Sequence, residues 1–239
     1  MNEKPILFSG PMVRAILWND GNVQLSTSNV QPPKTQTRRV MKPQPSADFL
    51  PEVGRYCPSF VDRETGEMYP GKECFGASDE TQDYPCPYGQ PGDRLWVKET
   101  WKPHLEGPIS DEFPLGTCVK FRADGALMKP ETWTVEQGFW CEAHETETKW
   151  RPSIFMPRWA SRITLEIVRV RVERLQDISE DDAIAEGLHQ DDLGLWTWGD
   201  YPSGSTSPRY AYQLLWEFIN GPGSWALNPW VWVIEFKRI

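Results

Sequence analysis

The alternation of apolar and polar positions predicts four β-strands along the chain. A short strand covers residues 5–8, and a second covers residues 94–101 after the turn-forming Pro91-Gly92-Asp93. Residues 163–172 alternate Ile, Leu and Val with Thr, Glu and Arg, a pattern typical of a long strand. The run Trp-Val-Trp-Val-Ile-Glu-Phe-Lys over residues 230–237 predicts a final strand near the end of the chain.

Helix-forming signals mark three further segments. Ser9-Gly10-Pro11 opens a short helix that continues through position 17, because proline suits the first helical turn. Ser179 can cap a second helix, with an acid at its third position, and Gly187 ends it. Pro208 opens a third helix, which Asn220-Gly221 ends. The apolar residues expected on one face of this third helix are Ala211, Leu215 and Phe218.

Several strands with a few helices predict a single α+β domain over residues 1–239, a mixed β-barrel with peripheral helices. Residues 18–33 are polar and predict a loop. Two irregular insertions are expected, at about residues 43–90 and 103–154, because these stretches are long and lack a clear periodic pattern. The second insertion is expected to hold a hairpin near residues 117–122.

The total charge argues against a general duplex-binding protein, but the charge is unevenly spread along the chain. The net charge is −9, whereas proteins that bind duplexes are usually basic. Residues 1–46 nevertheless carry six basic and two acidic side chains, and residues 149–174 carry seven and two. Residues 175–200 carry eight acids and no Lys or Arg. Two interpretations remain open: these faces neutralise one another, or they border a phosphate-binding cleft.

The cysteines and the N-terminus indicate a reducing compartment. The chain has five cysteines, an odd number, and its start lacks the pattern of a signal peptide, so reduced thiols in a cytoplasm are expected. No apolar run has the length of a membrane span. Cys57, Cys74 and Cys86 share one Pro/Gly-rich region, and a thiolate metal site there is an alternative. No metal and no cofactor are otherwise expected.

The sharpest local cluster of reactive groups is Lys34-Thr-Gln-Thr-Arg-Arg39. Lys34 and Thr37 are three positions apart, so one helical turn would place both on the same face. A hydroxyl beside an amine can act as a nucleophile with its activator. The alternative is a solvated basic turn.

Three segments in this order resemble the start of an ASCH domain: Lys4-Pro-Ile-Leu-Phe, Met12-Val-Arg-Ala-Ile-Leu and the Lys34–Arg39 cluster. The family motif is roughly Gly-x-Lys-x-x-Glu-x-Arg. Lys34 and Arg39 fit its lysine and arginine, whereas Thr37 stands at the glutamate position and Pro32 at the glycine position, after an apparent insertion. The resemblance implies a PUA-like barrel associated with RNA. The longer form is similar to ASCH proteins of phages and prophages.

One branch of the family, bacterial amidohydrolases that deacetylate N4-acetylcytidine, resembles the chain more closely. That branch has Lys-Thr-x-Thr at this place, and a Leu-x-x-Ile-Ser-Glu segment six residues before a catalytic glutamate. Here the segment is 175–180, and the sixth residue beyond it is Glu186. The branch also ends in Val-Ile-Glu-Phe-Lys, which matches residues 233–237. Matching segments cover about half the chain.

The resemblance implies that Lys34, Thr37 and Glu186 are catalytic and surround one pocket. Thr37 is the candidate nucleophile, and either Lys34 or Glu186 is the base, depending on whether burial or a nearby carboxylate governs the lysine. The implied function is removal of an acyl group from an N4-acetylcytidine-like substrate. Two alternatives stay open: a non-catalytic module that binds single-stranded RNA or a modified nucleotide, and a ribonuclease. No membrane partner is expected, and the sequence does not indicate an oligomeric state.

A second group of candidate substrate-binding residues follows in the strand at 94–101, in addition to Arg39. Period-two geometry directs Glu99 and Trp101 to one face and Trp96 to the other. An aromatic ring and a carboxylate could stack a base and accept a hydrogen bond from its amino group. The alternative is core tryptophan with a surface acid. The arginines of residues 158–174 are expected either to line a phosphate track or to form a solvated face.

Overall fold

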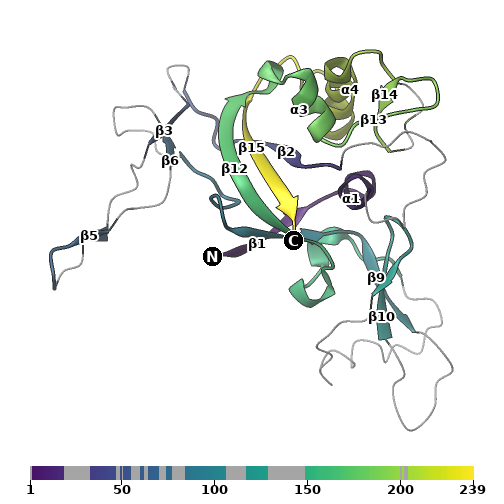
Figure 1. The fold of residues 1–239 in the computed structure, drawn as a ribbon, viewed down its shortest axis with the longest axis horizontal. Helices are drawn as coiled ribbons and strands as arrows, with labels where there is room; N and C mark the ends of the chain where they lie inside the picture. The colour runs from purple at the N-terminus through teal and green to yellow at the C-terminus, as the bar shows by residue number, and fades with distance from the viewer. Residues whose placement is uncertain are drawn as a thin grey trace, which may run out of the picture.

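We analysed a computed structural model of the 239-residue chain (Figure 1). The structure describes residues 2–18, 33–46, 49, 51–54, 60–61, 64–69, 74–76, 84–105, 117–128, 149–199, 201 and 204–239. The loop expected at 18–33 therefore lies almost entirely outside the described residues, as does Cys57.

A five-stranded mixed sheet forms the centre of the molecule (Figure 1). Its strands in spatial order are β1 (Glu3–Leu7), β8 (Arg94–Lys98), β12 (Thr164–Arg174), β15 (Trp230–Arg238) and β2 (Gln36–Val40). β1 runs parallel to β8, and every other neighbouring pair is antiparallel. The prediction of an α+β fold with a mixed sheet is confirmed.

The sheet is open, so the expected closed barrel is not observed. β1 and β2 stand at its two edges, and no ladder joins them within the described strands. The edges do approach each other at one point, where the Arg39 guanidinium donates to the Leu7 carbonyl oxygen at 2.6 Å. A side chain thus bridges the gap that backbone pairing would have to close in a barrel.

The last strand is buried on both faces, which explains its nearly unbroken apolar sequence. Alternate residues of β15 enter two different cores. Facing α1 and β1 are Trp230, Trp232, Ile234 and Phe236. On the opposite face, Val231 and Val233 pack beneath the two C-terminal helices. β15 therefore forms the wall between the main core and the helical layer.

Within the described residues, three α-helices flank the sheet: α1 (Gly10–Leu17), α3 (Glu180–Ala185) and α4 (Pro208–Asn220). The predicted caps are present, since Ser179 Oγ accepts a hydrogen bond from the Asp182 backbone N–H at 3.0 Å, and Gly187 follows with φ +98°. The expected apolar face of α4 is partly wrong. Phe218 is 69% exposed, and Tyr212 and Trp216 are buried in its place.

The predicted strand at 94–101 is broken after position 98. β8 ends there, and Trp101 begins β9 (Trp101–Leu105), which belongs to a separate three-stranded sheet with β10 (Thr117–Phe121) and β11 (Leu127–Met128). β10 and β11 form the hairpin predicted in this insertion. Short 3₁₀ turns at Ser153–Phe155, Arg158–Ala160 and Leu175–Asp177 flank β12.

The described residues of the first insertion form short strands. Its described strands are β3 (Glu52–Gly54), β4 (Phe60–Val61), β5 (Met68–Tyr69), β6 (Cys74–Gly76) and β7 (Tyr84–Pro85). Cys74 is disulfide-bonded, so the expectation of reduced thiols is wrong for this residue and it offers no free thiolate to a metal. A further small hairpin, β13 (His189–Gln190) and β14 (Trp196–Thr197), lies between α3 and α4 in the chain.

Among the described helices, none combines the length and the apolar character needed to cross a membrane.

Candidate functional site

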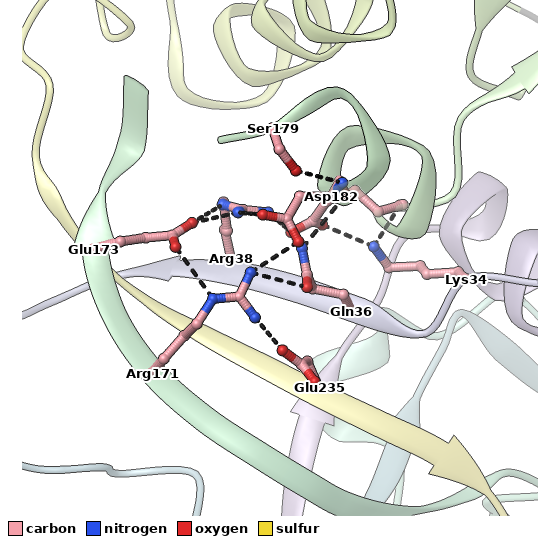
Figure 2. A network of polar contacts seen from close by, with 9 residues as sticks. Lys34, Gln36, Arg38, Arg171, Glu173, Ser179, Asp182 and Glu235 are labelled. Atoms are coloured by element: carbon pink, nitrogen blue, oxygen red, sulfur yellow. Dashed lines mark hydrogen bonds and ion pairs between the residues drawn. The ribbon is translucent and has the colours of Figure 1, made fainter. Parts of the chain in front are cut away.

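A network of charged side chains covers the face of the sheet beneath α3 (Figure 2). The alternation of each strand directs these side chains to the same face. A register shift between Ile167 and Arg169 in β12 resets that alternation, so Val170 and Val172 enter the core while Arg171 faces the helix. The residues drawn and labelled in Figure 2 are Lys34, Gln36, Arg38, Arg171, Glu173, Ser179, Asp182 and Glu235.

Glu186 is the point where the two deepest cations of this network meet. Lys34 Nζ lies 2.9 Å from Glu186 Oε2, and Arg38 Nη1 lies 3.2 Å from Oε1. The side chains of both cations have no exposed surface, and that of Glu186 is 3% exposed. Each carboxylate oxygen therefore has its own cationic donor, in a site from which water is nearly excluded.

Backbone contacts hold Lys34 against the ends of two helices. Its N–H donates to the Ala15 carbonyl of α1 at 2.9 Å, and the next N–H donates to the Ala185 carbonyl of α3 at 3.0 Å. The Lys34 ammonium also donates to the Glu186 backbone carbonyl. Despite the insertion before the motif, these contacts hold Lys34 at Glu186, which lies about 150 positions away in sequence.

Gly187 permits this close approach. Its φ of +98° is in the left-handed region that favours glycine, and a Cβ there would lie 2.9 Å from Ala15 Cβ and 3.2 Å from Lys34 Cβ. Only glycine fits without moving α1 or the Lys34 chain. The helical turn expected to align Lys34 with Thr37 is wrong, however, because Thr37 lies in strand β2.

Burial dominates the protonation chemistry of Lys34. Desolvation lowers the pKa of its amine from the ordinary 10.5, and the neighbouring Glu186 carboxylate only partly opposes that shift. Two N–H groups of the Lys34 amine donate to Glu186, one to its backbone carbonyl and one to its carboxylate. A buried amine with a lowered pKa is suited to releasing and taking up a proton.

Outer ion pairs fix Arg38 in place. Its guanidinium contacts Glu173 and, at 3.1 Å, Asp182 Oδ2. Arg171 holds the same two acids from the other side, through Asp182 Oδ1 at 2.8 Å and Glu173 Oε2 at 3.1 Å, and it also pairs with Glu235. Four elements, β2, β12, β15 and α3, are thereby tied around one cluster (Figure 2).

A cavity of about 190 Å³ opens beside this cluster. Thr37, which is 1% exposed, lines it together with Glu186, Arg38 and Arg39. Sequence reasoning missed one whole wall of the cavity, the α4 residues Tyr212, Leu215, Trp216, Ile219 and Asn220, and also Leu7, Ser9, Met12, Arg38 and Val40. The helical pattern of this segment reads as ordinary core packing, so it carried no signal for a ligand wall.

Tyr212 gives the cavity a neutral polar wall. Burial raises the pKa of its hydroxyl well above the ordinary 10.0, so the ring does not ionise near neutral pH. The Arg38 guanidinium lies 5.9 Å from the centre of the Tyr212 ring. The cavity therefore combines the cations of β2 with a tyrosine and apolar residues of α4.

The three candidates from the β8–β9 segment do not line this cavity. Trp101 is buried in a small core beside β10 and β11, so its expected role as a stacking platform is wrong. Glu99 is 1% exposed and is held by Arg162 through two contacts of 2.9 Å. Trp96 is half-buried, with the Lys98 ammonium 5.3 Å from its ring centre. The break after position 98 removes the shared face on which the expectation rested.

Internal acids neutralise several arginines expected to form a phosphate track. Arg158 pairs with Glu3, and Arg162 pairs with Glu99 and Asp124. Arg171 belongs to the network beneath α3. Arg171 pairs with Asp182 of the acidic segment 175–200, as the interpretation of mutual neutralisation expects, whereas Arg158 and Arg162 are neutralised by acids outside that segment.

Within the described ranges, no three His, Cys, Asp or Glu side chains gather as a metal site would require. Comparisons with protein-family models, with curated proteins and with solved structures find no match to this chain.

Proposed function

We propose that this chain is a nucleoside-handling protein of the ASCH type that hydrolyses the exocyclic N-acyl bond of N4-acetylcytidine-like substrates without a metal. One observation carries the proposal. Lys34 is bound to Glu186 deep in the protein, and Glu186 lines the same small cavity as Thr37. A hydroxyl, an amine with a lowered pKa and a carboxylate are the groups that acyl transfer requires.

In this proposal Thr37 attacks and Lys34 moves the proton. The neutral amine takes the hydroxyl proton as Thr37 Oγ bonds to the acyl carbon, and it returns that proton to N4 as the C–N bond breaks. Water then cleaves the threonyl ester, which releases the carboxylic acid and restores the hydroxyl. Arg38 and Arg39, at the cavity wall, stabilise the oxyanion of each tetrahedral intermediate.

Lys34 rather than Glu186 is the base in this scheme. Both oxygens of Glu186 already accept hydrogen bonds, from Lys34 and Arg38, so this carboxylate is engaged in holding those two side chains. Lys34 donates two hydrogens to Glu186, so a neutral amine would keep its lone pair free to accept a proton. Glu186 therefore orients Lys34, and Arg38 in turn orients Glu186.

The size and charge of the site favour a nucleoside over an RNA strand. A cavity of about 190 Å³ accepts a base or a small group but does not follow a backbone. Binding of a strand needs free cations along a groove, whereas Arg158, Arg162 and Arg171 are engaged by carboxylates of the protein itself. Binding without chemistry and ribonuclease activity remain as outcomes of the test.

Hydrolysis of N4-acetylcytidine tests this proposal. The purified chain is incubated with the nucleoside in the presence of a chelator, and cytidine and acetate are quantified. Lys34→Met is the informative variant, because it keeps the buried volume that Ala would empty. The matched control is Lys237→Met, whose side chain is 59% exposed. We expect activity in the wild type and control and none in Lys34→Met; an inactive wild type would refute the hydrolase.

A further inference from the structure

A second cavity adjoins the first and differs from it in character. Its volume is about 160 Å³, and Glu186 lines both cavities. The lining residues found only in the second are Pro11, Gly187, Trp198, Gly199 and Phe218. Among its described lining residues Glu186 alone is ionisable, whereas the first cavity also has two arginines and a tyrosine. The two spaces thus form a polar and an apolar lobe that share Ser9, Met12, Glu186, Leu215 and Ile219 as lining residues.

The wall of the apolar lobe is an ordered aromatic cluster. Trp198 stacks on Tyr201 with ring centres 4.1 Å apart and planes at 16°, and Phe218 packs against both at 6.3 and 5.8 Å. Gly199 allows the loop to reach α1, since its φ is +53° and a Cβ there would lie 2.8 Å from Pro11 Cβ. This loop follows β14, outside the segments that resemble the ASCH branch.

We infer that the apolar lobe is an acyl subsite sized for a phenyl ring, so that the substrates include N4-aroyl cytosine nucleosides such as N4-benzoylcytidine. The inference rests on the proposed function and names its substrate class. A cavity of about 150 Å³ lined by apolar side chains is large enough to bind benzene. An acetyl methyl group would leave most of a 160 Å³ lobe unfilled. The cytosine base occupies the polar lobe, and the cleaved bond is the same C–N4 amide bond.

Phe218→Ala tests the subsite with little risk to folding, because Phe218 is 69% exposed. The control is Leu227→Ala, an apolar residue that is 79% exposed and lines neither cavity. For the wild type, Phe218→Ala and Leu227→Ala, kcat/KM for N4-benzoylcytidine is divided by kcat/KM for N4-acetylcytidine. Comparing this ratio among the three proteins cancels the difference in intrinsic reactivity between the two amides. We expect Phe218→Ala to lower this ratio about tenfold, chiefly through the benzoyl substrate, and the control to leave it unchanged.

A binding measurement separates this inference from the hydrolase proposal. N4-benzylcytidine and N4-methylcytidine lack the amide carbonyl, and calorimetry gives their dissociation constants without turnover. We expect the wild type to bind the benzyl compound about tenfold more tightly, and Phe218→Ala to lose that preference. A wild type that shows the preference but hydrolyses nothing would refute the hydrolase and keep the subsite. Equal affinities, or an unchanged preference in Phe218→Ala, would refute the subsite even where hydrolysis is observed.

Discussion

Replacing Glu186 by Gln removes the one negative charge shared by two fully buried cations. Arg38 keeps Glu173 and Asp182 as partners, so the charge left uncompensated is that of Lys34. Breaking a buried pair by removing one partner costs roughly 3–5 kcal/mol. Lys34 can limit this cost by releasing its proton, so we place the loss of unfolding free energy near the lower bound, at about 3 kcal/mol.

Thermal and chemical unfolding measure that loss. For a chain of this size a loss of about 3 kcal/mol lowers the midpoint temperature by roughly 6–12 °C. Asp181→Asn is the matched control, since it removes a charge from an exposed position on the same helix. It should change the unfolding free energy by less than about 0.5 kcal/mol.

The pH dependence gives a second, independent check. Because the folded pKa of Lys34 lies below the ordinary 10.5, the unfolded chain binds more protons between those two values, and this group makes stability rise with pH. Glu186→Gln removes the charge that opposes the shift, so the pKa of Lys34 falls further. The stability gap between wild type and variant should therefore shrink as pH rises toward 10.5. A gap no larger than that of Asp181→Asn, or one that widens with pH, would refute the reasoning.

Three further predictions follow from other parts of the structure. Arg162→Met leaves Glu99 buried without its cation, and burial already raises the pKa of Glu99. The charged carboxylate is therefore the costly form, so thermal melting should show a larger loss of stability at about pH 8 than at about pH 5. Gly187→Ala forces a side chain into the left-handed region against Ala15, so denaturant titration should show a loss above about 1 kcal/mol. Binding of single-stranded RNA, measured by anisotropy, should be weak and salt-sensitive; tight, salt-resistant binding would contradict the network's internal neutralisation.

Local sequence patterns predicted those strands and helices whose apolar runs and capping residues are local in the sequence. The apolar run of β15 indicated a buried strand, and the cap at Ser179 with the stop at Gly187 placed α3 within a residue. The break after β8 was not predictable, because residues 94–101 alternate smoothly while tertiary contacts direct Trp101 into another sheet. Phe218 was misplaced since the helical pattern does not reveal where the sheet beneath α4 ends.

The site was predictable only as far as the resemblance reached. Lys34, Thr37 and Glu186 came from motifs. Thr37 and Glu186 line one cavity, whereas Lys34 does not line it and is linked to it through its ion pair with Glu186, about 150 positions away. Arg38 sits in a basic run and looks solvated in sequence. Its burial depends on acids from β12 and α3 that no local pattern pairs with it. The same holds for Tyr212, whose place on the cavity wall is set by how α4 packs.

Turnover of N4-acetylcytidine by the wild type, Thr37→Ser and Thr37→Val tests the central claim most directly. The account predicts release of acetate by the wild type, a reduced rate in Thr37→Ser because the hydroxyl is retained, and no release above background in Thr37→Val. An inactive wild type, or a Thr37→Val variant as active as the wild type, would contradict the claim that Thr37, in the cavity that Glu186 also lines, cleaves an N-acyl bond.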